Sequence, residues 1–186
     1  MAFRYLKVAS GYFRQGEILD NIIIPEPVAI SPDDDNLVSL SINHHRRMVL
    51  LSPECDMKSH HDGGSSPPVP NLKTMNHIVL FDLFEEGEIR NKELNSGIWS
   101  RVKDNSHFRY YHLPKATLHA QDDMPDYYID FKRPFGIGID FMSTLVSGQI
   151  VKRVGLIPYP LLMDLLHRYH SYIGKVWLHD KYMESP

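Results

Sequence analysis

Short apolar runs that end at proline or at charged residues are the feature that most constrains how this chain can fold. The strongest is residues 77–84, HIVLFDLF, which ends at the acidic stretch 85–88. Runs of this length, rich in β-branched and aromatic residues, are typical of strands. Others cover residues 18–24, 37–42, 48–51, 108–113, 127–131 and 149–157. The pattern predicts many short strands.

Two segments have helical spacing instead. Over residues 158–175, apolar side chains recur at intervals of three and four, after a proline-rich start that suits a helix N-terminus and before Gly174 as a stop. Residues 88–104 have similar spacing and predict a central helix. We therefore expect an α+β fold, in which a partly closed antiparallel β-barrel carries a central helix and a docked C-terminal helix.

The length favours one domain over residues 1–186. A chain of 186 residues would bury about 70% of the surface that it exposes when unfolded, enough for one core. Residues 60–71, HHDGGSSPPVPN, combine glycine, serine and proline, so we predict a flexible loop over residues 58–72.

Composition excludes several functional classes. The net charge is −3, so the chain is not a strongly basic nucleic-acid binder, although a local basic face is possible. One cysteine excludes an intrachain disulfide. We see no apolar membrane-spanning segment and no signal peptide, and expect a cytoplasmic protein without a membrane partner. Nucleotide-binding, serine-hydrolase and zinc-protease motifs are lacking, and we expect neither a cofactor nor a bound metal.

Two stretches carry a resemblance to a known family. Gly16-Glu17-Ile18, followed by residues 45–53, HRRMVLLSP, resembles the early strands of MazF/PemK-type toxins. The resemblance implies an SH3-like barrel that acts as a metal-independent endoribonuclease or, in relatives, as a gyrase poison. In the ribonucleases, the arginine that Arg46 matches stabilises the phosphate. The chain departs from the family at Arg47, where the family has proline, and at the next strand, 77–84, which lacks serine and threonine. For the resemblance to hold, the strand that follows Gly16 and the strand that follows Arg47 must be neighbours in one sheet. The Arg46 guanidinium must also be exposed to water.

His44, His45, Arg46 and Arg47 form the first candidate site. Arginine offers a planar fork of donors that suits phosphate oxygens, and histidine can exchange a proton near neutral pH. Cleavage of RNA needs a base, an acid and a cation, which these residues could supply, with His44, His45 and Arg46 as the catalytic set. The alternative interpretation is a solvated strand entry.

A second candidate combines cationic and aromatic residues at Arg109, Tyr111 and His112. On a strand, Arg109 and Tyr111 would share one face, and an aromatic ring beside an arginine can hold single-stranded RNA. The alternative is a core strand lined by tyrosines. The basic pairs Lys132-Arg133 and Lys152-Arg153 could join these residues in one patch.

Cys55 and Asp56 form the third candidate. The thiol could act as a nucleophile, or could bind a metal with Asp56 and with His60 or His61. Cysteine is also among the most buried residue types, so the alternative is an inert core position.

Three functional hypotheses follow. The first is a small bacterial binding domain that engages RNA or a protein partner in a toxin-antitoxin, stress or defence setting, with a homodimer as one option; the setting comes from the resemblance. The second is a MazF/PemK-like endoribonuclease. The third is a metal- or thiol-dependent enzyme around Cys55.

Overall fold

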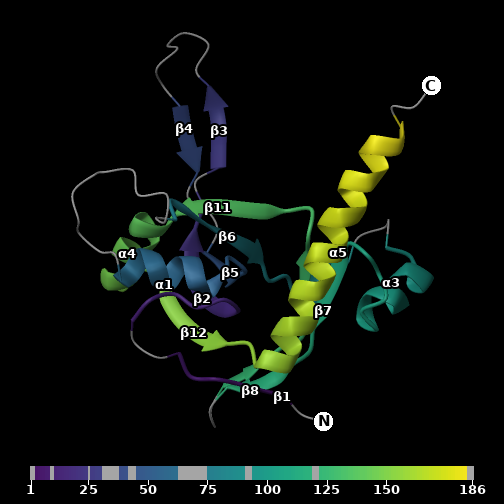
Figure 1. The fold of residues 1–186 in the computed structure, drawn as a ribbon, viewed down its shortest axis with the longest axis horizontal. Coiled ribbons are helices and arrows are strands. Elements are labelled where there is room, and N and C mark those ends of the chain that lie inside the picture. The colour runs from purple at the N-terminus through teal and green to yellow at the C-terminus, as the bar shows by residue number, and fades with distance from the viewer. Residues whose placement is uncertain are drawn as a thin grey trace.

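A five-stranded antiparallel sheet forms the centre of the molecule (Figure 1). The computed structural model describes residues 3–8, 11–24, 26–30, 38–41, 45–62, 75–90, 94–118 and 122–183. The strand order of the sheet is β11 (Pro134–Gly138), β6 (His77–Asp82), β5 (His45–Leu50), β2 (Glu17–Ile23) and β12 (Lys152–Leu156). All four strand pairs are antiparallel.

Helices cover both faces of this sheet. These are α1 (Glu54–Asp62), α4 (Ile139–Ser147) and α5 (Tyr159–Met183), while α2 (Glu86–Ile89) and α3 (Ser96–Lys103) pack on a smaller sheet. Ile18 of β2 packs in one core with Leu165 of α5. The next residue, Leu19, packs in a second core with Met57 of α1 and Met142 of α4. This alternation follows from the two-residue period of a strand, and Figure 1 shows α1 and α4 on one side of the sheet and α5 on the other.

Smaller sheets surround the central one. A three-stranded sheet contains β1 (Phe3–Tyr5), β8 (Ala116–Leu118) and β9 (Asp122–Met124), and two-stranded sheets contain β7 (Tyr110–Leu113) with β10 (Tyr127–Asp130) and β3 (Glu26–Ile30) with β4 (Val38–Ser41). The β7/β10 pair packs against α3, where the rings of Trp99 and Tyr128 lie 4.8 Å apart.

The predicted α+β class is confirmed, and so is the pairing of the strands after Gly16 and Arg47. In that pair, Ile18 lies opposite Val49 and Leu19 opposite Met48. Among the described strands, β11 and β12 at the two edges each pair with one neighbour in the central sheet, so no closed barrel is found there.

Three predicted boundaries are wrong. Residues 58–62, predicted as loop, belong to α1, whose first turn is acidic and whose last turn holds two histidines, a distribution that suits the helix dipole. Residues 63–72 lie outside the described residues. The helix predicted over 88–104 is instead α2 and α3, because Asn95 caps a new helix by accepting a hydrogen bond from the Ile98 amide at 3.0 Å. Helix α5 continues past Gly174, since one glycine costs a helix only about 1 kcal/mol.

The start of β2 is fixed by two tight contacts. Gly16 has a φ of 83°, and a Cβ there would lie 2.9 Å from the Leu162 side chain of α5. Glu17 is fully buried and pairs with Arg153, whose Nη2 lies 2.9 Å from Oε2. Because Arg153 is committed to this pair, Lys152 and Arg153 do not form the exposed basic pair that the sequence suggested.

No helix in the described part of the chain combines the length and the apolar character needed to cross a bilayer.

Candidate functional site

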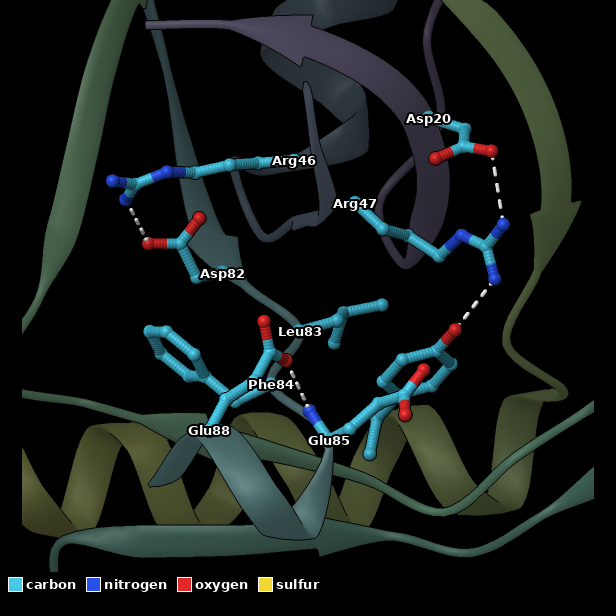
Figure 2. A pocket seen from close by; sticks show the side chains of 9 residues that line it. Asp20, Arg46, Arg47, Asp82, Leu83, Phe84, Glu85 and Glu88 are labelled. Atoms are coloured by element: carbon cyan, nitrogen blue, oxygen red, sulfur yellow. Dashed lines mark hydrogen bonds and ion pairs between the residues drawn. The ribbon is translucent and has the colours of Figure 1, made fainter. Parts of the chain in front are cut away.

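One cavity contains two of the predicted site residues. It has a volume of about 400 Å³ and lies where β2, β5 and β6 meet the segment before α2. Figure 2 shows Arg46 with Asp82 on one side and Arg47 with Asp20 on the other. The remaining lining residues are Leu83, Phe84, Glu85, Glu88 and Tyr127. We call this the Arg46/Arg47 cavity.

The guanidinium of Arg46 is not held in water, and that expectation is wrong. Its Nη1 donates to Oδ2 of Asp82 at 2.8 Å, and the Asp82 side chain is only 9% exposed. Burial raises the pKa of Asp82 above its usual value, against the opposing effect of Arg46. Arg46 therefore offers its charge to an internal carboxylate, which weakens the case for a phosphate contact.

Arg47 is also paired. Its Nη2 lies 2.9 Å from Oδ2 of Asp20, and its Nη1 lies 2.5 Å from the hydroxyl of Tyr127. Although burial opposes the effect, the hydrogen bond from Arg47 holds the pKa of Asp20 below its usual value. Asn21, with a φ of 66°, lies in an irregularity of the β2/β5 register next to Asp20. Asparagine tolerates this conformation better than most residues.

The two histidines of the first candidate site cannot be placed beside these arginines. His44 lies outside the described residues, and His45 is described only as the first residue of β5. The catalytic set His44, His45 and Arg46 therefore stays a prediction.

The Cys55 candidate does not assemble a site in the described structure. Cys55 and Asp56 lie on the exposed face of α1, so the interpretation of Cys55 as a core residue is wrong. The reason is that residues 54–62 form an amphipathic helix whose buried residue is Met57. Nε2 of His60 lies 2.9 Å from Oδ1 of Asp140 on α4. Across the described residues, no group of three histidine, cysteine or acidic side chains could hold a metal ion.

The Arg109, Tyr111 and His112 candidate is mostly structural. Arg109 donates two hydrogen bonds to the buried Asp130, at 2.7 and 2.6 Å. Tyr111 is fully buried, and its hydroxyl lies 3.4 Å from the Leu161 carbonyl. His112 lies 2.9 Å from Asp126. Of the two interpretations, the exposed platform is wrong and the core strand lined by tyrosines agrees with the burial of Tyr110 and Tyr111, because β7 is inside, covered by α3 and α5.

A different aromatic and basic site lies beside this strand. We call it the α5 pocket; it has a volume of about 250 Å³ between the segment after α3 and α5. It is lined by Ser106, His107, Phe108, His167, Arg168, Ser171, Tyr172 and Lys175. Among the described residues that line it, none is acidic.

Phe108 is the most exposed aromatic residue of the α5 pocket, at 52%. Its ring lies nearly parallel to that of His107, at 24° and 5.0 Å, and to that of Tyr172, at 20° and 6.3 Å. Tyr172 in turn contacts the core ring of Phe131 at 5.9 Å. The exposed ring is thus backed by a row of rings that leads into the core.

The electrostatics of the α5 pocket are positive. Arg168 and Lys175 line it, and burial, with Arg101 and Arg109 nearby, lowers the pKa of His107. Asp164 lies one helical turn before Arg168, with a long 3.4 Å contact to its Nε. The oxygens of an anionic ligand would therefore meet cations here rather than carboxylates.

A tight turn after α3 holds this pocket in shape. Asn105 has a φ of 58°, and its side-chain amide exchanges two hydrogen bonds with the backbone of His112, at 2.9 and 2.6 Å. The backbone amides of Ser106 and His107 both donate to the Arg101 carbonyl at 2.9 Å. His107 and Phe108 are therefore presented by fixed backbone.

Sequence reasoning missed the α5 pocket, although it carried a signal. The sequence pattern places Phe108 in an apolar strand and uses the apolar stripe over residues 158–175 only to predict a helix. Arg168 and Lys175, seven residues apart at the edge of the apolar stripe of that helix, were the available clue.

Comparison with known proteins finds no family model, no curated protein and no solved structure that matches this chain. The resemblance of residues 16–53 to MazF/PemK-type proteins therefore stays a prediction.

Proposed function

We propose that this protein is a binding domain for single-stranded RNA and that the α5 pocket holds the strand. The observation that carries the proposal is the Phe108 ring, half exposed beside Tyr172 and bordered by cations. A base can stack on an exposed aromatic ring, while arginine and lysine contact the adjacent phosphates.

The α5 pocket supports RNA binding better than the Arg46/Arg47 cavity does. In the cavity, both arginines already pair with carboxylates, and four acidic residues line it against two arginines. In the α5 pocket, the described lining has two cations and no carboxylate, and its one ion pair among the described residues is the long 3.4 Å contact of Arg168 with Asp164, outside the lining. The proposal thus keeps the RNA partner and moves its contact to a different surface.

Part of the proposal derives from the MazF/PemK resemblance. This part is the preference for RNA, the cytoplasmic location and the toxin-antitoxin, stress or defence setting. The SH3-like barrel also derives from the resemblance, and the strands β2, β5 and β6, which are antiparallel neighbours in the sheet, support it. We propose binding rather than cleavage because Arg46, the phosphate contact that the resemblance implies, pairs with Asp82.

The test is a titration of the protein against a labelled 12-nucleotide oligouridine, followed by fluorescence anisotropy at several salt concentrations. Two or three phosphate contacts should weaken binding roughly tenfold between 50 and 200 mM salt. Absence of binding, or binding that does not respond to salt, would contradict the proposal. A matched oligodeoxythymidine tests the preference for RNA.

A mixed RNA pool incubated with the protein in EDTA separates binding from cleavage. The proposal predicts an intact pool at protein concentrations that saturate the oligouridine. Fragmentation of the pool would instead support the metal-independent endoribonuclease.

A further inference from the structure

We infer that the Arg46/Arg47 cavity is a second binding site, which takes a guanidinium or primary ammonium group on an alkyl stem. This inference goes beyond RNA binding and concerns a different part of the molecule. It depends on the charges that line the cavity and on one buried oxygen that has no hydrogen-bond partner among the described residues.

The first step is the balance of charge. Arg46 and Arg47 each pair with one carboxylate, from Asp82 and Asp20. Glu85 and Glu88 also line the cavity, and within the described residues neither is in an ion pair with a basic side chain. Among the lining residues, the carboxylates outnumber the arginines by two. Arg133, outside the lining, also acts on Asp82, and a cationic group entering the cavity would offset the negative charge that remains.

The second step is the buried oxygen of Asp82. Oδ2 of this side chain accepts from Arg46, but Oδ1 is buried and has no hydrogen-bond partner among the described residues. The side chain is only 9% exposed, and Figure 2 shows the carboxylate beside the Arg46 guanidinium, on the side of the cavity away from Arg47. A buried carboxylate oxygen without a donor is costly, so a ligand that donates to it gains affinity.

The third step is the shape of the opening. Leu83 and Phe84 are the apolar part of the lining, next to Glu85 and Glu88. Apolar walls suit the methylene stem of a basic side chain, while its charged end reaches the carboxylates. The guanidinium of Arg133 already lies over the ring of Phe84, 5.7 Å from its centroid. An arginine or lysine side chain has this combination of stem and charge.

Isothermal titration calorimetry at low ionic strength tests the inference. The probes are N-acetylarginine methylamide, N-acetyllysine methylamide and, as a neutral isostere of the first, N-acetylcitrulline methylamide. We expect the two cationic probes to bind and the citrulline probe to bind at least tenfold more weakly, because it lacks the charge. Equal binding of the citrulline and arginine probes, or no binding of any probe at millimolar concentration, would overturn the inference.

Variants locate the site. Asp82→Asn should weaken binding of the arginine probe about tenfold or more, since hydrogen bonds to charged groups are worth about 1.5 to 3 kcal/mol. Glu88→Gln, at an exposed position, should weaken it in the same direction and keeps the test valid if Asp82→Asn fails to fold. Asp56→Asn, on the exposed face of α1, is the matched control and should bind as the wild type does. Unchanged affinity in both cavity variants would overturn the inference.

The source of the basic group is distinguished by a fourth probe, butylguanidinium. Tighter binding of N-acetylarginine methylamide would assign the site to a side chain of a polypeptide partner. Tighter binding of butylguanidinium would assign it to a small free guanidinium compound. Either order supports a site for the cationic group.

Discussion

The ring of Phe108 lies nearly parallel to that of Tyr172, with an angle of 20° and a centroid distance of 6.3 Å. The two residues come from distant parts of the chain, the segment after α3 and helix α5, so the folded structure is needed to join them. Phe108 is 52% exposed, whereas Tyr172 also contacts the core ring of Phe131. This relationship places an accessible ring on a supported base, next to Arg168 and Lys175.

Phe108→Ala should weaken binding of oligouridine without unfolding the protein. Stacking of one base on an aromatic ring is worth about 1 to 3 kcal/mol, which corresponds to roughly 5- to 150-fold in affinity. Because the ring is half exposed, the free energy of unfolding should change by no more than about 1 kcal/mol. Anisotropy titration and urea denaturation measure the two effects. Phe141→Ala, at an exposed ring on α4, should leave affinity unchanged, and equal losses in both variants would argue against the α5 pocket.

Arg168→Gln and Lys175→Gln should each reduce the dependence of RNA affinity on salt. If each side chain neutralises one phosphate, the slope of log affinity against log salt should become less steep by about 0.7 per variant for a single strand. Lys132→Gln removes an exposed cation outside the α5 pocket and should keep the wild-type slope. A slope that changes only in the Lys132 variant would place the phosphates elsewhere.

Arg153→Ala should strongly destabilise the fold. Its loss would leave the fully buried Glu17 carboxylate without its cation and would remove hydrogen bonds to the Gly11 and Tyr12 carbonyls at 2.8 and 2.9 Å. Removal of one partner of a buried ion pair costs about 3 to 5 kcal/mol. Chemical denaturation measures the loss, and the neighbouring exposed Lys152→Ala should stay within about 0.5 kcal/mol of the wild type. Similar stabilities of the two variants would contradict the pairing.

His107 should make stability depend on pH below its unfolded pKa. Burial, with help from Arg101 and Arg109, lowers the pKa of His107 from 6.5 in the folded protein. Its Nδ1 accepts a hydrogen bond from the Arg109 amide at 3.2 Å, which protonation would break. The unfolded chain then binds more protons, so stability is retained above pH 6.5 and lost as the pH falls through the lowered value.

The measurement for His107 is urea denaturation at pH 7.5 and pH 5.5. The wild type should lose more stability over this interval than His107→Gln does, because the variant lacks the titrating group. An identical loss in the two proteins would show that His107 does not titrate in this way.

The sequence predicts the central sheet well because the pairing partners are apolar. Ile18 and Val49 lie opposite each other in β2 and β5, as expected from two neighbouring runs. The paired state of Arg46 was not predictable in the same way. Asp82 lies within the strongest apolar run and was counted only as part of a strand, and nothing local shows that its carboxylate meets Arg46 from 36 residues away.

The site residues were predicted less well for a related reason. Tyr111 and Phe108 are three positions apart, yet one is fully buried and the other half exposed. The two-residue period of a strand shows which residues share a face, but it does not show which face another element covers. The position of α5 decides this, and the contact between Phe108 and Tyr172 joins segments whose spacing in the sequence carries no signal.

Ultraviolet cross-linking of the protein to oligouridine, followed by trypsin digestion and mass spectrometry, tests the central claim most directly. Cleavage after Lys103, Arg109, Arg168 and Lys175 isolates the two halves of the α5 pocket as peptides 104–109 and 169–175. We expect cross-linked nucleotide on both peptides. In the Phe108→Ala variant, the cross-link to peptide 104–109 should be lost. Cross-links confined to peptides from β5 or from other surfaces would contradict the central claim.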